Sequence, residues 1–168
     1  SQDTPDRIHL GVGRGRFDEH KGDIGKCAAT LVLDHVRQAV SLEPDTDAAL
    51  KRITDWVFLE DTGKLAKVEL RDFTIPVILK GEFERSNRSS HAIVDLGFAI
   101  LDALMPWQLN MVKTERDWEN RTEFDSPFGR AVAIESDALD VDTYAYRHGF
   151  AIVVQVTHNG RHRSIRAD

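Results

Sequence analysis

The sequence predicts a mixed α/β fold: a helix-rich layered domain that ends in a C-terminal β-hairpin. Apolar residues recur at helical spacing through the first two thirds of the chain, which is typical of amphipathic helices. Near the end, the β-branched run at residues 150–157 predicts a strand. The turn signal His158-Asn159-Gly160 follows it and leads to a partner strand at residues 161–166. The length of 168 residues is enough to bury a core of this kind.

The first elements are a short strand and two helices. Residues 7–12 predict a strand that enters a glycine-rich turn, and residues 24–42 predict an amphipathic helix. Pro44 ends that helix, and the turn around it caps a second helix at residues 47–59. Gly63 suits the C-terminus of this second helix, because glycine tolerates the left-handed backbone found there.

The middle of the chain is dominated by one helical pattern. Residues 73–79 fit either a strand or a short helix interrupted by Pro76, and residues 82–90 predict a loop. Residues 91–105 are apolar almost all round, so we expect a central helix there. Pro106 should break or kink it before a polar helix at residues 107–119.

The last third predicts two short helices and the hairpin. Ser126-Pro127 can start a helix that carries Phe128 and Ile134, and residues 141–147 can form another. Asn159-Gly160 supplies the positive φ angles of a tight type I′ turn. We therefore divide the chain into an α/β part at residues 1–125 and a C-terminal element at residues 126–168, together forming one compact unit.

Composition limits the class of partner and the compartment. The net charge of −6 argues against non-specific binding of a polyanion over the whole surface, although a local basic patch is compatible with it. Cys27 is the only cysteine, which suits a reducing compartment. We find no run of about 18 apolar residues and no secretory signal, so we expect a cytoplasmic protein with no membrane partner.

The most informative motif is Phe17-Asp18-Glu19-His20, directly after the glycine turn. Hard ions such as Mg²⁺ and Mn²⁺ take carboxylate oxygens, and Mn²⁺ also accepts imidazole. Asp61, at the end of the second helix, is the best candidate for a ligand from elsewhere in the chain. Asp95 and Asp102 share one helix face and either contribute to the site or bond to their neighbours. The alternative is a solvated charged loop.

This region resembles the Asp-His-His phosphoesterases, and especially their MYG-type relatives, over about residues 7–63. The resemblance rests on the glycine turn, the motif at residues 17–20, the small-residue stretch at residues 27–32, and Asp61-Thr62-Gly63. It implies a hydrolase of phosphoester bonds that uses Mn²⁺ or Mg²⁺. Its substrate would be a phosphorylated small molecule or single-stranded nucleic acid, and a homodimer is compatible with it.

The resemblance also implies roles for individual residues. Asp18 would bind a metal or orient a ligand, Glu19 would stand where the family has a metal-binding histidine, and Asp61 would be the distal ligand. His20 would bind metal and help to position the phosphate, so it is the catalytic candidate. Because Glu19 and Gly11 differ from the family pattern, an alternative is a non-catalytic nucleotide- or nucleic-acid-binding module that has lost part of the metal site.

A second candidate site is the basic end of the chain. Arg161, His162, Arg163 and Arg166 concentrate positive charge in an acidic protein, and arginine forks match phosphate groups well. On a regular strand Arg161 and Arg163 share one face, and His162 and Arg166 share the other. We predict that these residues contact substrate phosphate. The alternative is that the charges protect an edge strand from aggregation.

Overall fold

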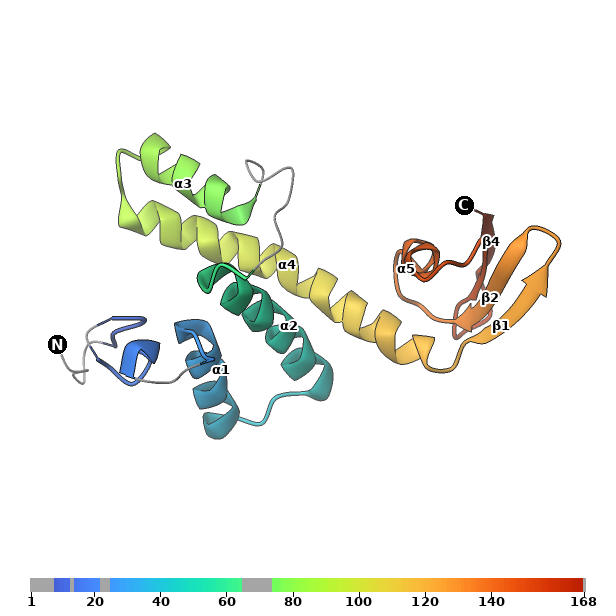
Figure 1. Ribbon diagram of the computed structural model, residues 1–168, viewed down its shortest axis with the longest axis horizontal. Helices are drawn as coiled ribbons and strands as arrows, with labels where there is room; N and C mark the ends of the chain where they lie inside the picture. Colours follow the sequence, from blue (N-terminus) through green and yellow to red (C-terminus); the bar gives the residue numbers. More distant parts are fainter. Residues whose placement is uncertain (1–7, 13, 22–24, 65–73, 168) are drawn as a thin grey trace. The chain divides into compact units, whose positions relative to one another are not determined.

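A computed structural model describes residues 8–12, 14–21, 25–64 and 74–167 (Figure 1). The elements in chain order are a 3₁₀ helix η1 (Glu19–Lys21), α1 (Ala28–Ala39), α2 (Pro44–Asp61), α3 (Ile75–Arg85), α4 (Ser90–Trp118), β1 (Thr122–Ser126), β2 (Gly129–Glu135), α5 (Val141–Arg147), β3 (Ile152–Val156) and β4 (Arg163–Ala167). The predicted mixed, helix-rich fold with a C-terminal hairpin is confirmed. Predictions for residues 7, 13, 24 and 73 fall outside the described residues.

The chain forms two compact units that divide within α4, an N-terminal unit at Ser1–Gln108 and a C-terminal unit at Leu109–Asp168. The predicted division at residues 125 and 126 would separate β1 from β2, with which it pairs. In the N-terminal unit, α1 packs against α2. The Arg37 guanidinium donates to both carboxylate oxygens of Asp47, at 2.6 and 3.0 Å, and so joins these helices. Arg52 of α2 donates to the Gln108 side chain of α4 at 2.9 Å.

The strand predicted at residues 7–12 is wrong over its described part. Residues 8–12 contain a single bridge, from Leu10 to Phe17, instead of a strand. The Gly11 amide donates to the Phe17 carbonyl at 2.9 Å, so the chain folds back on itself within a few residues. Gly11 has φ of +66°, and such a turn leaves no extended partner for a ladder.

The helix α4 corrects two predictions. It continues through Pro106, so the proline does not break it, although proline cannot donate the usual hydrogen bond inside a helix. The stretch at residues 91–105 is not buried: the Phe98 side chain is 63% exposed, and Val94 and Leu101 are also exposed. The apolar pattern predicted the helix correctly but not its burial. A helix that is apolar all round can form without showing which of its faces another element covers. The stretch at residues 73–79, which fitted a strand or a helix, is helical from Ile75 as part of α3. This helix also includes residues 82–85 of the predicted loop at residues 82–90.

The length and composition of α4 would also allow it to cross a membrane. Its most apolar 18-residue window has a mean hydropathy of 1.4, and none of that window is buried. The core helix of a soluble protein passes the same test of length and composition. The absence of a membrane partner therefore stays a prediction.

The C-terminal unit is a four-stranded sheet in the order β1-β2-β3-β4. β1 and β2 are antiparallel, β2 and β3 are parallel through the crossover helix α5, and β3 and β4 are antiparallel (Figure 1). The buried core of this unit joins the end of α4, one face of the sheet and α5. Its members are Trp118, Val132, Ile134, Ala138, Val141, Ala145, Phe150 and Val153. The core is thus built from elements that lie up to 35 residues apart in sequence, from Trp118 to Val153.

The helix predicted from Ser126 is wrong, because residues 122–135 form the β1–β2 hairpin. Ser126 pairs with Gly129 across the turn, and the Ser126 hydroxyl donates to the Gly129 carbonyl at 2.7 Å. The Phe128 amide donates to the same hydroxyl oxygen at 3.2 Å. Ser-Pro therefore starts a turn here, with Gly129 at φ of +117° where glycine is favoured.

The hairpin between β3 and β4 is confirmed, but its tight two-residue turn is wrong. The Thr157 amide donates to the His162 carbonyl at 3.1 Å, so residues 158–161 form a four-residue loop. Gly160 has φ of +64°, whereas Asn159 is not among the described residues with positive φ. The Asn159 side chain instead accepts from the Arg161 amide at 2.9 Å, which stabilises the longer loop.

Candidate metal centre

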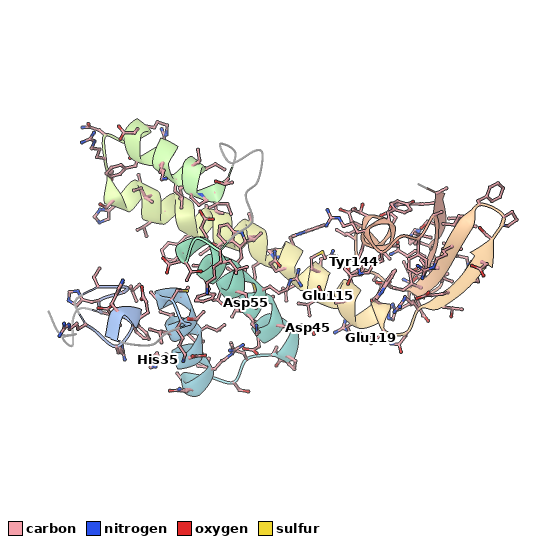
Figure 2. The ribbon with its side chains drawn as sticks, viewed as in Figure 1. His35, Asp45, Asp55, Glu115, Glu119 and Tyr144 are labelled. Atoms are coloured by element: carbon pink, nitrogen blue, oxygen red, sulfur yellow. The ribbon has the colours of Figure 1, made fainter. Side chains whose placement is uncertain are left out.

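The aromatic residue of the motif anchors it to the N-terminal unit. Phe17 is buried, and its ring packs edge-on against that of His35, with 5.4 Å between the ring centroids. His35 belongs to α1 (Figure 2). The Asp18 amide donates to the Gly15 carbonyl at 3.3 Å. This turn and the buried ring direct the three ionisable side chains that follow to one place.

Asp18 is buried at the centre of this turn and is held by three hydrogen bonds. One carboxylate oxygen, Oδ2, accepts from the Arg14 amide at 2.6 Å. The other, Oδ1, accepts from the His20 amide at 3.1 Å and lies 2.9 Å from the His20 ring nitrogen Nδ1. A carboxylate oxygen has two lone pairs, so Oδ2 still has one free for a further donor or a metal ion.

The contacts lower the pKa of Asp18 and raise the pKa of His20, and both shifts favour the ion pair between these two side chains. Burial on its own would raise the pKa of Asp18, but the hydrogen bonds from Arg14 and His20 together outweigh it and lower that pKa. The hydrogen bond to Asp18 raises the pKa of His20, and the charge of Glu19 adds to the effect. Asp18 is therefore an anion at neutral pH that holds the imidazole by Nδ1 and leaves Nε2 toward solvent.

We predict that His20 of the metal-free protein titrates above 6.5, its ordinary pKa. Because the folded pKa exceeds the unfolded one, protonated His20 stabilises the folded state below the unfolded pKa. This stabilisation is lost as the pH rises through the folded pKa. An NMR titration of the His20 ring measures the pKa, and Asp18→Asn should lower it toward 6.5. A wild-type pKa at or below 6.5 would contradict the hydrogen bond to Asp18.

Glu19 provides the observation that fits a bound cation. Its Oε2 atom is buried without a hydrogen-bond partner within the described residues, and its other oxygen lies 3.5 Å from Nδ1 of His20. A buried oxygen of this kind costs free energy unless a donor or a cation satisfies it. The residues present therefore fit a hard divalent ion.

The three side chains already lie near the spacing that one ion needs. A ligand atom from each of Asp18, Glu19 and His20 lies within 4.8 Å of the others. Ligands at about 2.1 Å from one ion lie at most about 4.2 Å apart, so this group is close to the spacing that one ion requires. The His20 side chain is 74% exposed, although its Nδ1 is held by Asp18.

The structure brings Asp61 toward this group without making it a member. Asp61 ends α2, followed by Gly63 at φ of +66°, as the sequence predicts. Its negative charge makes a small contribution to the raised pKa of His20. The three-residue group found among the described residues does not include Asp61, Asp95 or Asp102. Asp61 thus acts on His20 through its charge, and its role as a ligand stays a prediction.

The basic hairpin belongs to the other unit, and only part of it is a strand. Arg161 and His162 lie in the loop before β4, so the strand alternation begins only at Arg163. Arg166 forms an ion pair with Asp142 at the start of α5, and this pairing lowers the pKa of Asp142 against the effect of burial. Arg161, His162 and Arg163 are exposed. Phosphate contact by these residues stays a prediction.

Sequence reasoning missed the contribution of Arg14. Its side chain points to the surface, but its backbone amide is the donor that holds Oδ2 of Asp18. Arg14 has φ of +57°, in the left-handed region that residues other than glycine rarely adopt. The signal in the sequence was the glycine-rich turn, which indicates unusual backbone angles without saying which residue adopts them.

No protein-family model, curated protein or solved structure matches the chain. The resemblance to the Asp-His-His phosphoesterases therefore depends on the residues of the motif, and its consequences for activity are proposals.

Proposed function

We propose that the chain is a metal-dependent hydrolase of phosphoester bonds, of the DHH-like class, with Asp18, Glu19 and His20 around Mn²⁺ or Mg²⁺. The observation that carries the proposal is the buried Oε2 atom of Glu19, which has no hydrogen-bond partner within the described residues and lies in a group with ligand atoms of Asp18 and His20. The imidazole and two carboxylates favour Mn²⁺ over Mg²⁺, because Mg²⁺ prefers oxygen ligands throughout.

The contacts of each side chain suggest which residues would bind the ion and which would orient a ligand. Glu19 Oε2 and His20 Nε2 would bind the ion directly, and Asp18 would orient His20 through Nδ1 while its Oδ2 lone pair stays available. A carboxylate that holds a ligating histidine by its second nitrogen fixes the tautomer and raises the basicity of the ring. A divalent ion bound in such a site supplies activation of water and neutralisation of charge on phosphoryl oxygens.

The substrate class comes from the resemblance to the Asp-His-His phosphoesterases. It implies a phosphorylated small molecule or single-stranded nucleic acid, whose phosphoryl oxygens a bound divalent ion could contact. The exposed Arg161 and His162 offer a further contact for a phosphate group.

Removal of the Asp18 carboxylate should abolish metal-dependent hydrolysis. The assay compares wild type, Asp18→Ala and Asp18→Asn on a chromogenic phosphodiester and on a short single-stranded oligonucleotide, with Mn²⁺ or with chelator. Thermal unfolding of each variant checks that it is folded. Asp125→Ala, an exposed carboxylate in the C-terminal unit, is the matched control and should keep full activity.

Unchanged turnover in both Asp18 variants would contradict the proposal. If wild type neither binds nor is stabilised by Mn²⁺, the binding-module alternative is favoured. In that case nucleic-acid binding that weakens steeply with salt would support binding through the basic residues Arg161 and His162 of the loop before β4.

A further inference from the structure

The sheet of the C-terminal unit has one covered face and one open face. Val132, Ile134 and Val153 belong to the buried core that includes α5. Because side chains alternate along a strand, their sequence neighbours lie on the opposite face. We call this second surface the open face. It consists of Thr122, Phe124 and Ser126 from β1, Gly129, Ala131, Ala133 and Glu135 from β2, Ile152, Val154 and Val156 from β3, and Arg163, Ile165 and Ala167 from β4.

The open face is largely apolar and is exposed at its outer strands, whereas Ala131 in β2 is fully buried. The Ile165 side chain is 75% exposed and that of Phe124 is 44% exposed. Val154 and Val156 lie on β3, between β2 and β4, and both side chains are half-buried. Apolar surface that remains in water on a sheet favours association with another apolar surface.

The strand register makes the open face complementary to itself. In one row across the sheet, Ala133 pairs with Val154 and Val154 pairs with Ile165. In the next row, Glu135 pairs with Val156 and Val156 pairs with Arg163. On either side of β3, a small residue therefore opposes a large one, and an acidic residue opposes a basic one.

We propose that the open face is the interface of a homodimer whose twofold axis runs along β3. This axis places β2 of one copy over β4 of the other at the same height. Ile165 then packs on the partner's Ala133, and Glu135 meets the partner's Arg163. Both contacts occur twice, as an isologous interface requires. Val154 and Val156 lie on the axis, where each meets its own copy at the spacing of about 10 Å usual for packed sheets.

The charges favour a second copy over a polyanion. Glu135 and Arg163 are exposed, and neither has an ion-pair partner among the residues that the structure describes. They are two strands apart, about 10 Å, so they do not satisfy each other within one protomer. A face with one acidic and one basic group does not attract phosphate chains, whereas a symmetric copy satisfies both groups at once.

The size of the face sets the strength of the association. Three overlapping strands of five residues cover about 14 by 16 Å, less than the roughly 800 Å² per partner of a standard stable interface. The dimer should therefore be weak and dissociate on dilution. This assignment gives Arg163 a protein partner and leaves Arg161 and His162 in the exposed loop.

Charge reversal tests the proposed register. Sedimentation of the full chain over the micromolar range should show a dimer that dissociates on dilution. Glu135→Arg and Arg163→Glu should each weaken association at least about tenfold, because each places like charges together. The double variant Glu135→Arg/Arg163→Glu restores opposite charges and should recover wild-type association. Asp125→Arg makes the same charge change on the opposite face of the sheet and should leave association unchanged.

Three outcomes would overturn the proposal. The first is a monomer at every concentration. The second is a dimer that the single reversals do not weaken, which would place the interface elsewhere. The third is a double variant that stays as weak as the singles. Ile165→Asp gives an independent check, since it should abolish the dimer while the midpoint of thermal unfolding of the monomer stays close to that of wild type.

Discussion

Replacing Trp118 with alanine should lower the free energy of unfolding of the C-terminal unit by about 3–5 kcal/mol, the usual cost of removing a large buried aromatic side chain. Trp118 is only 7% exposed at the end of α4. Its ring contacts those of Tyr144, His148 and Phe150, with centroids 5.2 to 5.7 Å apart, and Tyr144 reaches it from α5 (Figure 2). Alanine would leave a cavity at the point where α4, α5 and the sheet meet.

Amide hydrogen exchange of β3 in the full chain measures this effect, because those amides exchange through opening of the unit. Phe128→Ala is the matched control. Phe128 is also a large aromatic residue of the C-terminal unit, but its side chain is 80% exposed on the β1–β2 turn. Its removal should change the free energy of unfolding by less than about 0.5 kcal/mol. Equal effects of the two substitutions would mean that the core does not depend on Trp118.

Replacing Glu19 with glutamine should weaken Mn²⁺ binding by at least about 100-fold, more than is usual for residues that only support a ligand. Glutamine keeps the shape of the side chain but replaces the anionic Oε2, the buried atom without a partner within the described residues, by a neutral group. The same change removes one negative charge from beside His20. Hard ions depend on the number of charged oxygen ligands, so both effects act in one direction.

Isothermal titration with Mn²⁺ measures the affinity, and metal-induced stabilisation in thermal unfolding gives a second reading. Glu84→Gln is the matched control, since the Glu84 side chain is 70% exposed on α3 and should bind no ion. The substitution should also stabilise or leave unchanged the metal-free protein, because it relieves a buried anion. If Glu19→Gln binds Mn²⁺ as tightly as wild type, Glu19 is not a ligand and the site as proposed is wrong.

The candidate site was accessible to sequence reasoning because its parts are neighbours in the chain. Asp18, Glu19 and His20 are consecutive, so one tight turn suffices to group them. The predicted partner Asp61 depends on how α2 packs, and it influences His20 only through its charge. The Arg14 amide was not foreseeable from residue types, since any residue with that backbone angle could donate it.

The two hairpins show where a local sequence pattern does not decide between two conformations. Residues 131–134 form a short apolar run that fits a helix or a strand, and the choice depends on the strands on either side. Asn159-Gly160 favoured a tight turn, but the Asn159 side chain bonds to the Arg161 amide and a longer loop forms. In both cases contacts outside the local window decided between conformations of similar energy.

The sequence by itself determined the mixed α/β class, the helices α1, α2 and α5, the strand β3, and the Asp18-Glu19-His20 motif. These depend on periodicity, capping and adjacency, which act within a few residues. Only the tertiary structure decided that residues 122–135 form a β-hairpin, that α4 is one helix whose stretch at residues 91–105 is not buried, and which sheet face is left open. These features depend on pairing and burial between distant residues, whose free energies exceed local preferences and cannot be read from a local pattern.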